Sequence, residues 1–534
     1  MFPKKLTRQV ICEPDQAVVE TGAGKLHGIV TEGTFIFRGV KYGEQKRFHP
    51  PTPVKPWQGV MEATVYGAVC PEIKTPVAHD QFPVPHFWYP QDEDCLYLNI
   101  WTRSLDRDAK KPVIVWIHGG GWNSGSGIEL YAYDGEEISA FGDVVYVSLN
   151  HRNGLLGFLD LSDFGEEYRT SNITCLQDLT LALAWIRENI AAFGGDPGNV
   201  TLAGQSGGGG KICALMNMPA ARGLFHKAII ESGIGTGEER ITKEHTRQVG
   251  RVTVEKLGLA QETIGEIEKI PFYKIARAAN AALAQVSAET GVPQAWQSVP
   301  CGEDFRGVAG PGHFSPETAQ IPMIVGSNFG EFNSNFNGTH LDGKKNSWTE
   351  AQKMPLLRER FGEDAEKTLE AFRKAWPEKN TADLLYMDTR MRRSHLRFAQ
   401  ARAGECGARI WNYLFSLEMP MNNGTTPWHN AEEPYALHNA CYHEASYIPG
   451  VSEALQDQMC GAWVAFARNG DPNHPGLPVW EPFEPDQPVT MIFDRETRVG
   501  HGHDAALLDL IRPSSKEKTP RKSTALGGGP RQSK

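Results

Sequence analysis

Five short apolar runs rich in β-branched residues alternate with helical patterns from residue 112 onward, and this alternation is the strongest constraint on the fold. The runs lie at residues 112–117, 143–149, 199–204, 227–232 and 321–326. Strands that alternate with helices build a mostly parallel sheet with helices packed on its faces. The sequence therefore predicts an α/β fold with a central, mostly parallel, twisted sheet.

The clearest helical pattern precedes the run at 199–204. Its apolar residues step by three and four positions: Leu176, Leu179, Leu183, Ile186, Ile190 and Phe193. Thr174 and Gln177 have the spacing of a capping box, and two glycines, Gly194 and Gly195, follow the last apolar residue. The pattern predicts a helix that is capped by Thr174 and ends at the glycines.

Composition and charge exclude several classes of protein. The chain has 534 residues, of which 40% are hydrophobic and 22% are charged, and no apolar run is long enough to span a membrane. A net charge of -10 argues against nucleic acid as a main partner, because a phosphate backbone needs a basic surface. The first 16 residues lack the apolar core of a signal peptide, so we expect a cytoplasmic location.

The nine cysteines indicate neither a disulfide scaffold nor a metal site. Their number is odd, and no C-x-x-C spacing occurs among them. Most are expected to be small buried apolar residues.

No clear boundary divides the chain, so we expect a single domain over residues 1–511. Helical patterns at about 240–320 and 345–405 predict a helical cap around a pocket. Residues 512–534 are basic and poor in apolar residues, which predicts a disordered tail. A membrane-surface patch is the weaker alternative for this tail, because no amphipathic helix accompanies the charge.

The proline-rich stretch at 470–488 could pass for a linker. It contains Val479, Trp480 and Phe483, which we expect to anchor it, and a strand-like VTMIFD follows. We therefore expect this stretch to wrap over the surface of the same domain.

The stretch GQSGGGGK at residues 204–211 allows two chemical interpretations. A phosphate-binding loop needs a glycine, four residues, then Gly-Lys and a hydroxyl residue for magnesium. Here Gln205 stands at the first glycine position and Ile212 follows the lysine. The Gly-x-Ser-x-Gly pattern around Ser206 instead fits a nucleophile elbow, in which small residues permit a strained turn between a strand and a helix.

A second glycine motif, IHGGGW at residues 117–122, follows the first apolar run. A serine nucleophile needs a base, a group that orients the base, and donors for the oxyanion. Consecutive glycines after a strand can turn backbone N–H groups toward one point and so provide such donors. A tight turn without function is the alternative, but two motifs in this order, each after a predicted strand, favour an enzyme.

Several long stretches together resemble the type-B carboxylesterase family, which includes carboxylesterases and cholinesterases. They are EDCLYLNIW at 93–101, IHGGGW at 117–122, ENIAAFGGDPGNVTLAGQSGGG at 188–209 and FARNGDPNHPGLPVW at 466–480. The resemblance covers residues from about 18 to 500 and is greatest to bacterial carboxylesterases. It implies an α/β-hydrolase fold with a catalytic triad in the order serine, acid, histidine.

The resemblance also implies the partners of Ser206. In GSNFGEFNSNF the acid position of the family falls on Glu331, and in WHNAEEPYAL the histidine position falls on His429. His438 is the competing histidine nearby. The Glu-x-Pro-Tyr that follows the histidine of the family comes after His429, which favours His429 over His438.

Further roles follow from the same resemblance. The family pattern implies an oxyanion hole formed by the backbone N–H groups of Gly120, Gly121 and Gly207. Ser232, in IIESG, matches a serine that supports the acid. Gln205 stands where cholinesterases carry a glutamate, which counts against a cholinesterase.

Two tryptophans and two cysteines complete the expected site. Trp122 is expected beside the oxyanion hole, where it would limit the acyl or alcohol group. Trp88 falls near the aromatic residue that binds choline in cholinesterases, but its aromatic neighbours favour the lining of a hydrophobic pocket mouth. Cysteines that match Cys70 and Cys95 form a disulfide in secreted relatives, and whether they pair here depends on the compartment.

The sequence thus predicts a serine hydrolase that cleaves a small-molecule carboxylic ester through an acyl-enzyme, without metal or organic cofactor. One alternative is an interaction protein on the same fold that has no catalytic activity. Another is a hydrolase specialised for an amide, a lactone or a particular natural-product ester. The sequence leaves the acyl and alcohol groups and the oligomeric state open.

Overall fold

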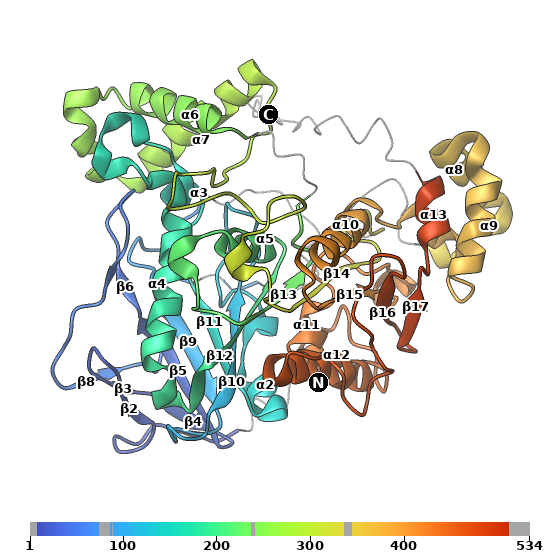
Figure 1. Cartoon of the computed structure of the whole chain (residues 1–534), viewed down its shortest axis with the longest axis horizontal. Coiled ribbons are helices and arrows are strands. Elements are labelled where there is room, and N and C mark those ends of the chain that lie inside the picture. The colour runs from blue at the N-terminus through green and yellow to red at the C-terminus, as the bar shows by residue number, and fades with distance from the viewer. Residues whose placement is uncertain (1–7, 74–85, 88, 236–240, 336–343, 512–534) are drawn as a thin grey trace, which may run out of the picture.

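A computed structural model describes residues 8–73, 86–87, 89–235, 241–335 and 344–511. Within this part of the chain, a central sheet of twelve strands runs through the molecule (Figure 1). In spatial order the strands are β1 (Val10–Ile11), β4 (Ile29–Thr31), β5 (Thr34–Lys41), β9 (Tyr97–Thr102), β11 (Val145–Leu149), β10 (Lys111–Ile117), β12 (Gly195–Gln205), β13 (Lys227–Glu231), β14 (Met323–Asn328), β15 (Ile410–Phe415), β16 (Val489–Phe493) and β17 (Arg498–His501). Two small sheets accompany it, formed by β2 (Val18–Glu20), β3 (Lys25–His27) and β8 (Val60–Glu62), and by β6 (Gly43–Glu44) and β7 (Thr52–Pro53).

The middle of the sheet is parallel from β11 to β16, and antiparallel strands extend it on both sides. All five predicted strands lie in this parallel part, which confirms the predicted α/β fold. Neighbouring strands also end at similar levels, since Ile117 pairs with both Leu149 and Gly204. The loops that follow these strands therefore emerge along one edge of the sheet, where α/β proteins form their sites.

Helices cover both faces of the sheet. They are α2 (Glu136–Gly142), α3 (Gly154–Phe158), α4 (Thr174–Asn189), α5 (Gly207–Met216), α6 (Lys243–Lys256), α7 (Phe272–Thr290), α8 (Glu350–Phe361), α9 (Ala365–Ala375), α10 (Arg390–Cys406), α11 (Glu433–Ala436), α12 (Ser452–Asn469) and α13 (Ala505–Leu510). Figure 1 shows α6 and α7 grouped on one side of the view and α8 and α9 on the other.

The alternation of side chains along β10 explains how the two faces are filled. Val113 and Val115 point into a core cluster with residues of α4, α5 and α10, such as Leu183. Ile114 and Trp116 point into a second cluster with residues of α2 and α12. Because side chains of a strand alternate between the faces of a sheet, an apolar run without polar interruptions can be buried on both faces.

The predicted helix before the elbow is confirmed as α4, but its predicted cap is wrong. Ile173 occupies the N-cap position, and Thr174 is the first helical residue. The Thr174 hydroxyl donates to the backbone carbonyl groups of Leu156 and Gly157 instead of capping the helix. The hydroxyl group therefore bonds to the neighbouring helix α3, which the local spacing could not indicate.

The proline-rich stretch at 470–488 has two of its three expected anchors. Trp480 and Phe483 are buried, whereas Val479 is 75% exposed. Consecutive residues in extended chain point to opposite sides, so Val479 faces outward while Trp480 faces the core. The strand expected after this stretch is β16.

The helices expected at about 240–320 and 345–405 occur over parts of these ranges, and their role as a cap stays a prediction. Helices α6 and α7 lie between residues 243 and 290, and α8, α9 and α10 lie between 350 and 406. Residues 291–315 have no helix, which corrects the helical assignment of that stretch. The expected tail at 512–534 lies outside the described residues, and the single-domain organisation stays a prediction. Among the described helices, none has the length and apolar character needed to cross a membrane.

Candidate active site

Ser206 lies on a sharp turn between β12 and α5. Its backbone has φ 52° and ψ -122°, a region that residues with a side chain seldom adopt. Its N–H donates to the carbonyl oxygen of Glu231 on the neighbouring strand β13 at 2.8 Å. A Cβ atom on Gly208 would meet the carbonyl oxygen of Ile117 at 1.9 Å, so only glycine fits there. These are the features of a nucleophile elbow.

Three side chains that are distant in sequence form one hydrogen-bonded chain. His429 Nε2 lies 2.8 Å from the Oγ atom of Ser206, and His429 Nδ1 hydrogen-bonds to Oε2 of Glu331. His429 is 1% exposed and Glu331 is fully buried. The structure thus brings together the three residues that the sequence selected. His438 instead hydrogen-bonds to Asp457.

The carboxylate of Glu331 is held from its other side. Its Oε1 atom accepts a hydrogen bond from the Ser232 hydroxyl at 2.6 Å and one from the Asn328 N–H at 2.7 Å. Ser232 and Glu331 both have positive φ angles, 49° and 47°. The strained backbone of both residues indicates that the surrounding structure enforces this arrangement.

The loop that carries Glu331 is paired with the loop that carries His429. The N–H of Gly330 donates to the carbonyl oxygen of Pro427 at 3.1 Å. Farther along, the Ser334 hydroxyl and the Asn335 amide contact backbone groups of Thr426 at 2.7 and 3.0 Å. These contacts link the two loops over several residues, so the separation of Glu331 and His429 does not depend on a single bond.

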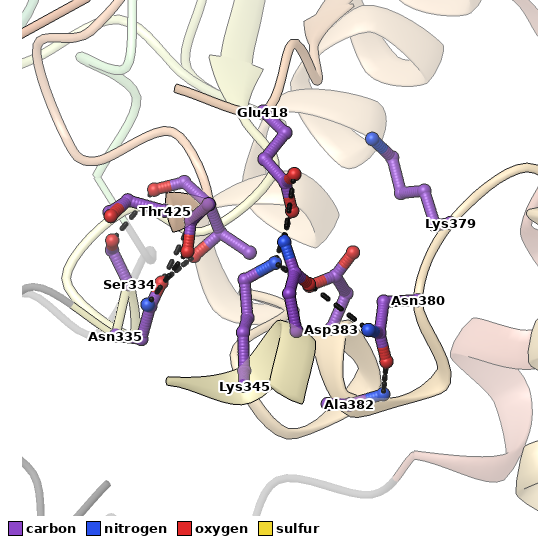
Figure 2. A network of polar contacts seen from close by, with 12 residues as sticks. Ser334, Asn335, Lys345, Lys379, Asn380, Ala382, Asp383, Glu418 and Thr425 are labelled. Carbon is purple, nitrogen blue, oxygen red and sulfur yellow. Dashed lines mark hydrogen bonds and ion pairs between the residues drawn. The ribbon is translucent and has the colours of Figure 1, made fainter. Parts of the chain in front are cut away.

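Figure 2 shows the contacts of Ser334 and Asn335 together with a second group of polar contacts around Lys345. Lys345 is fully buried and forms ion pairs with Asp383, at 2.7 Å, and with Glu418. Asn346 donates to both Glu418 and the carbonyl oxygen of Asn423. The loop before His429 is therefore tied to the segments around Lys345 and Asp383.

The two glycine motifs meet at the expected oxyanion hole. Gly120 and Gly121 have φ angles of 80° and 62°, which turn the backbone as only glycine does readily. A Cβ atom on Gly207 would lie 2.0 Å from the carbonyl oxygen of Gly121, so the two segments are in close contact. Within the described part of the chain, the N–H groups of these three glycines form no backbone hydrogen bond outside regular secondary structure.

Several buried carboxyl groups lie around Ser206, His429 and Glu331. Burial raises the pKa of Glu231 to about 7 and that of Asp388 to about 7, and the charge of Glu331 adds to the effect on Asp388. Burial also raises the pKa of Glu432 well above its ordinary value, with further contributions from Glu231 and Glu331. Protons held on these groups limit the negative charge near the histidine.

Two residues that the sequence did not identify as functional hold the backbone of His429. The side-chain amide of Gln205 donates to the carbonyl oxygen of His429 at 2.7 Å, and that of Asn328 donates to the same oxygen at 3.1 Å. Both residues end strands of the parallel sheet. An amide at a strand end beside a predicted catalytic residue is the signal that could have identified them.

The other expected site residues have mixed outcomes. Trp122 is half-buried and packs edge-on against Phe158 with ring centroids 5.3 Å apart. Trp88 lies outside the described residues. Cys70 and Cys95 are buried free thiols, and the hydrogen bond with Cys70, together with burial, raises the pKa of Cys95 well above its ordinary value. No group of three or more histidine, cysteine or acidic side chains in the described ranges could hold a metal ion.

Comparisons with known proteins agree with this geometry. The profile of the carboxylesterase family matches residues 15–510. The para-nitrobenzyl esterase of Bacillus subtilis is 30% identical over 94% of this chain and 99% of its own length, and the phenmedipham hydrolase of Pseudarthrobacter oxydans is 32% identical over 93% and 97%. A solved esterase from the anaerobic Clostridium hathewayi is 41% identical, with a TM-score of 0.88 over 94% of this chain and 99% of that one. With matches that span nearly the full length of each protein, the chain belongs to the carboxylesterase family of carboxylic ester hydrolases.

Proposed function

We propose that this protein hydrolyses small-molecule carboxylic esters through an acyl-enzyme, with Ser206, His429 and Glu331 as its catalytic triad. The observation that carries the proposal is the continuous chain of hydrogen bonds from the Ser206 hydroxyl through the imidazole of His429 to the carboxylate of Glu331. A serine hydroxyl is a weak nucleophile at neutral pH, and it becomes effective when an oriented base accepts its proton.

The reaction begins when Ser206 Oγ attacks the ester carbonyl and His429 Nε2 takes the hydroxyl proton. Glu331 accepts a hydrogen bond from Nδ1–H and stabilises the imidazolium that forms. The N–H groups of Gly120, Gly121 and Gly207 donate to the oxyanion of the tetrahedral intermediate. His429 then gives its proton to the departing alcohol, which leaves an acyl group on Ser206.

Water completes the cycle. His429 takes a proton from a water molecule that attacks the acyl carbonyl, and the same oxyanion donors stabilise the second tetrahedral intermediate. When this intermediate collapses, the proton returns to Ser206 and the carboxylic acid leaves.

Initial rates with p-nitrophenyl acetate, butyrate and octanoate, for the wild type and for Ser206→Ala, test the proposal. The esterase from Clostridium hathewayi is described as able to hydrolyse aliphatic aromatic polyesters, so a short aliphatic aromatic oligoester joins the panel. We expect the wild type to turn over at least one ester and the variant to lose about 10³-fold or more in kcat. Equal activity in both proteins would show that Ser206 is not the nucleophile.

A wild type that is folded yet inert on every ester would favour the two alternatives, a hydrolase for another substrate class or an interaction protein without catalytic activity. Turnover of an amide or a lactone under the same conditions would then identify a hydrolase with another substrate class. Binding without turnover would identify an interaction protein.

A further inference from the structure

Lys211 is a cation in the interior of the protein that contacts the glycine loop at residues 117–122. It lies on α5, five residues after Ser206, and is fully buried. Among the described residues its Nζ atom donates to two backbone carbonyl oxygens, at 3.0 Å from Gly121 and 3.4 Å from His118, and forms no ion pair with a carboxylate. Lysine is almost never fully buried without a charged partner, because removing an ammonium group from water is costly.

The two carbonyl groups that Lys211 contacts bracket the oxyanion loop. The His118 carbonyl belongs to the peptide unit that precedes Gly119, and the Gly121 carbonyl belongs to the unit that precedes Trp122. Between them lie the two peptide units that carry the N–H groups of Gly120 and Gly121. The ammonium group therefore holds both ends of the segment that supplies two of the proposed oxyanion donors.

This segment needs such support because it is rich in glycine. Gly120 and Gly121 both have positive φ angles, and glycine allows a peptide unit to rotate more freely than other residues do. The Gly121 carbonyl also lies against Gly207, the third proposed donor, since a Cβ atom there would be 2.0 Å from its oxygen. A rotation of the Gly121 carbonyl would disturb both halves of the hole at once.

The charged and titratable groups that face Lys211 leave it as a source of positive charge. Burial, and then Lys211 itself, lower the pKa values of His118 and His151 well below their ordinary value, and their rings stack 4.5 Å apart. Burial raises the pKa of the Cys175 thiol far above neutrality. Glu129 is the acidic group that acts on Lys211 from a distance. Burial lowers the pKa of Lys211 to about 8, so the ammonium form still predominates at pH 7.

We propose that Lys211 is the positioning residue of the oxyanion hole. Its ammonium group fixes the carbonyl groups of His118 and Gly121, so that the N–H groups of Gly120 and Gly121 point to one place, and its charge favours the negative charge that develops there. The inference rests on the proposed function, because it assigns Lys211 to the oxyanion hole of that mechanism.

The test compares Lys211→Met, which removes the charge and the donors, with Lys211→Gln, which keeps donors without charge. Lys353→Met is the matched control, because Lys353 is a largely buried lysine on α8 that pairs with Glu350. Titration with a fluorophosphonate that labels Ser206 counts correctly folded sites in the variants that keep this serine, and their rates are divided by this count. The rate of Ser206→Ala is divided by its protein concentration. Ser206→Ala is measured beside these variants.

We expect Lys211→Met to lower kcat by about 10- to 100-fold, less than the loss from removing a direct oxyanion donor, with KM changed by less than about 3-fold. The affinity for a trifluoromethyl ketone, which forms an oxyanion on addition of Ser206, should fall by the same factor as kcat. Lys211→Gln should recover part of the loss, and Lys353→Met should match the wild type.

The pH dependence separates charge from hydrogen bonding. As Lys211 loses its proton, the ratio of wild-type to Lys211→Gln activity should decline between about pH 7 and about pH 9. A constant ratio would overturn the role of charge, and full recovery in Lys211→Gln would do the same. If Lys211→Met does not fold, the kcat of Lys211→Gln and the pH dependence of its activity relative to the wild type still test the role of Lys211.

The remaining outcomes distinguish the two proposals. A Lys211→Met variant with wild-type kcat and ketone affinity, beside an inactive Ser206→Ala, would overturn the role of Lys211 alone. An active Ser206→Ala would overturn the proposed function itself.

Discussion

The Nε2 atom of His429 lies 2.8 Å from the Oγ atom of Ser206, although 223 residues separate them in the sequence. Their backbones are linked as well, because the side chain of Gln205 donates to the carbonyl oxygen of His429. Gln205 therefore helps to hold His429 beside Ser206. This arrangement is possible because β12 ends, and the loop after β15 begins, at the same edge of the sheet.

Replacement of Ser232 tests the support of the acid. Ser232→Ala removes the hydrogen bond to Glu331 Oε1, which is 2.6 Å long and fully buried. We expect kcat to fall by about 5- to 30-fold, which corresponds to ~1–2 kcal/mol for a lost bond to a charged group, with KM nearly unchanged. Steady-state kinetics with p-nitrophenyl butyrate measure both values.

Ser287→Ala is the control for this prediction. Ser287 is a buried serine on α7, and its hydroxyl has no hydrogen-bond partner among the described residues. It should keep wild-type kcat. An equal loss of kcat in the two variants would show that the Ser232 effect is general destabilisation rather than support of Glu331.

A methyl group at position 207 tests the contact between the two parts of the oxyanion hole. The added Cβ of Gly207→Ala would lie 2.0 Å from the Gly121 carbonyl oxygen, so the loop must move. We expect kcat to fall by about 10-fold or more, because one displaced oxyanion donor costs up to about 10²–10³-fold. The adduct with a trifluoromethyl ketone should weaken in parallel.

Gly404→Ala serves as the comparison for Gly207→Ala. A Cβ atom there meets no atom within 4 Å, and the residue lies within α10. This variant should keep full activity and gain up to ~1 kcal/mol of stability, because alanine favours a helix over glycine. Wild-type kcat in Gly207→Ala would contradict the close packing of the hole.

Lys211 should reduce the stability of the protein while it supports activity. Burial lowers its pKa from 10.5 to about 8, so the unfolded chain binds more protons than the folded one between these values. Below about pH 8 the folded protein therefore carries the full cost of a buried ammonium, ~3 kcal/mol at pH 7, and the cost vanishes as the pH approaches 10.5.

Lys211→Met should consequently be more stable than the wild type at pH 7, and its advantage should shrink as the pH rises from about 8 to about 10. Urea unfolding at several pH values measures this difference. An advantage that is independent of pH would show that the gain comes from packing rather than from the charge.

The buried ion pair between Arg152 and Asp178 should carry a large share of the stability. Both side chains are fully buried, and the guanidinium contacts both carboxylate oxygens at 2.8 and 2.6 Å. Arg152→Met leaves Asp178 buried without its partner, which should lower the free energy of unfolding by about 3–5 kcal/mol. Arg358→Met, at an exposed pair with Glu366, should change it by less than ~1 kcal/mol.

At acid pH, the difference in the free energy of unfolding between Arg152→Met and the wild type should become smaller. Burial raises the pKa of Asp178, and without arginine its carboxyl group can take a proton instead of remaining charged. Thermal unfolding of both proteins at about pH 5 and about pH 8 checks this point. An equal loss of stability in Arg152→Met at both pH values would mean that the arginine contributes mainly through packing.

The sequence alone determined the parallel sheet, the elbow at Ser206 and the glycine loop at 117–122, because each depends on local patterns. Apolar runs define strands, and Gly-x-Ser-x-Gly after a strand defines the turn. It could not assign Glu331 or His429 from spacing alone, since any of many acids and 17 histidines could have served. The family resemblance selected them, and the structure brings them together with Ser206.

Only the tertiary structure decided the contacts that surround this core. Asn328 and Gln205 meet the carbonyl group of His429 because the ends of β12 and β14 and the loop after β15 lie at one edge of the sheet. The hydroxyl of Thr174 bonds to helix α3 instead of capping its own helix, and Lys211 becomes a buried contact of the glycine loop at 117–122. Local patterns encode strands and turns, whereas the partner of a polar side chain depends on which distant segments the packed core brings within hydrogen-bonding distance.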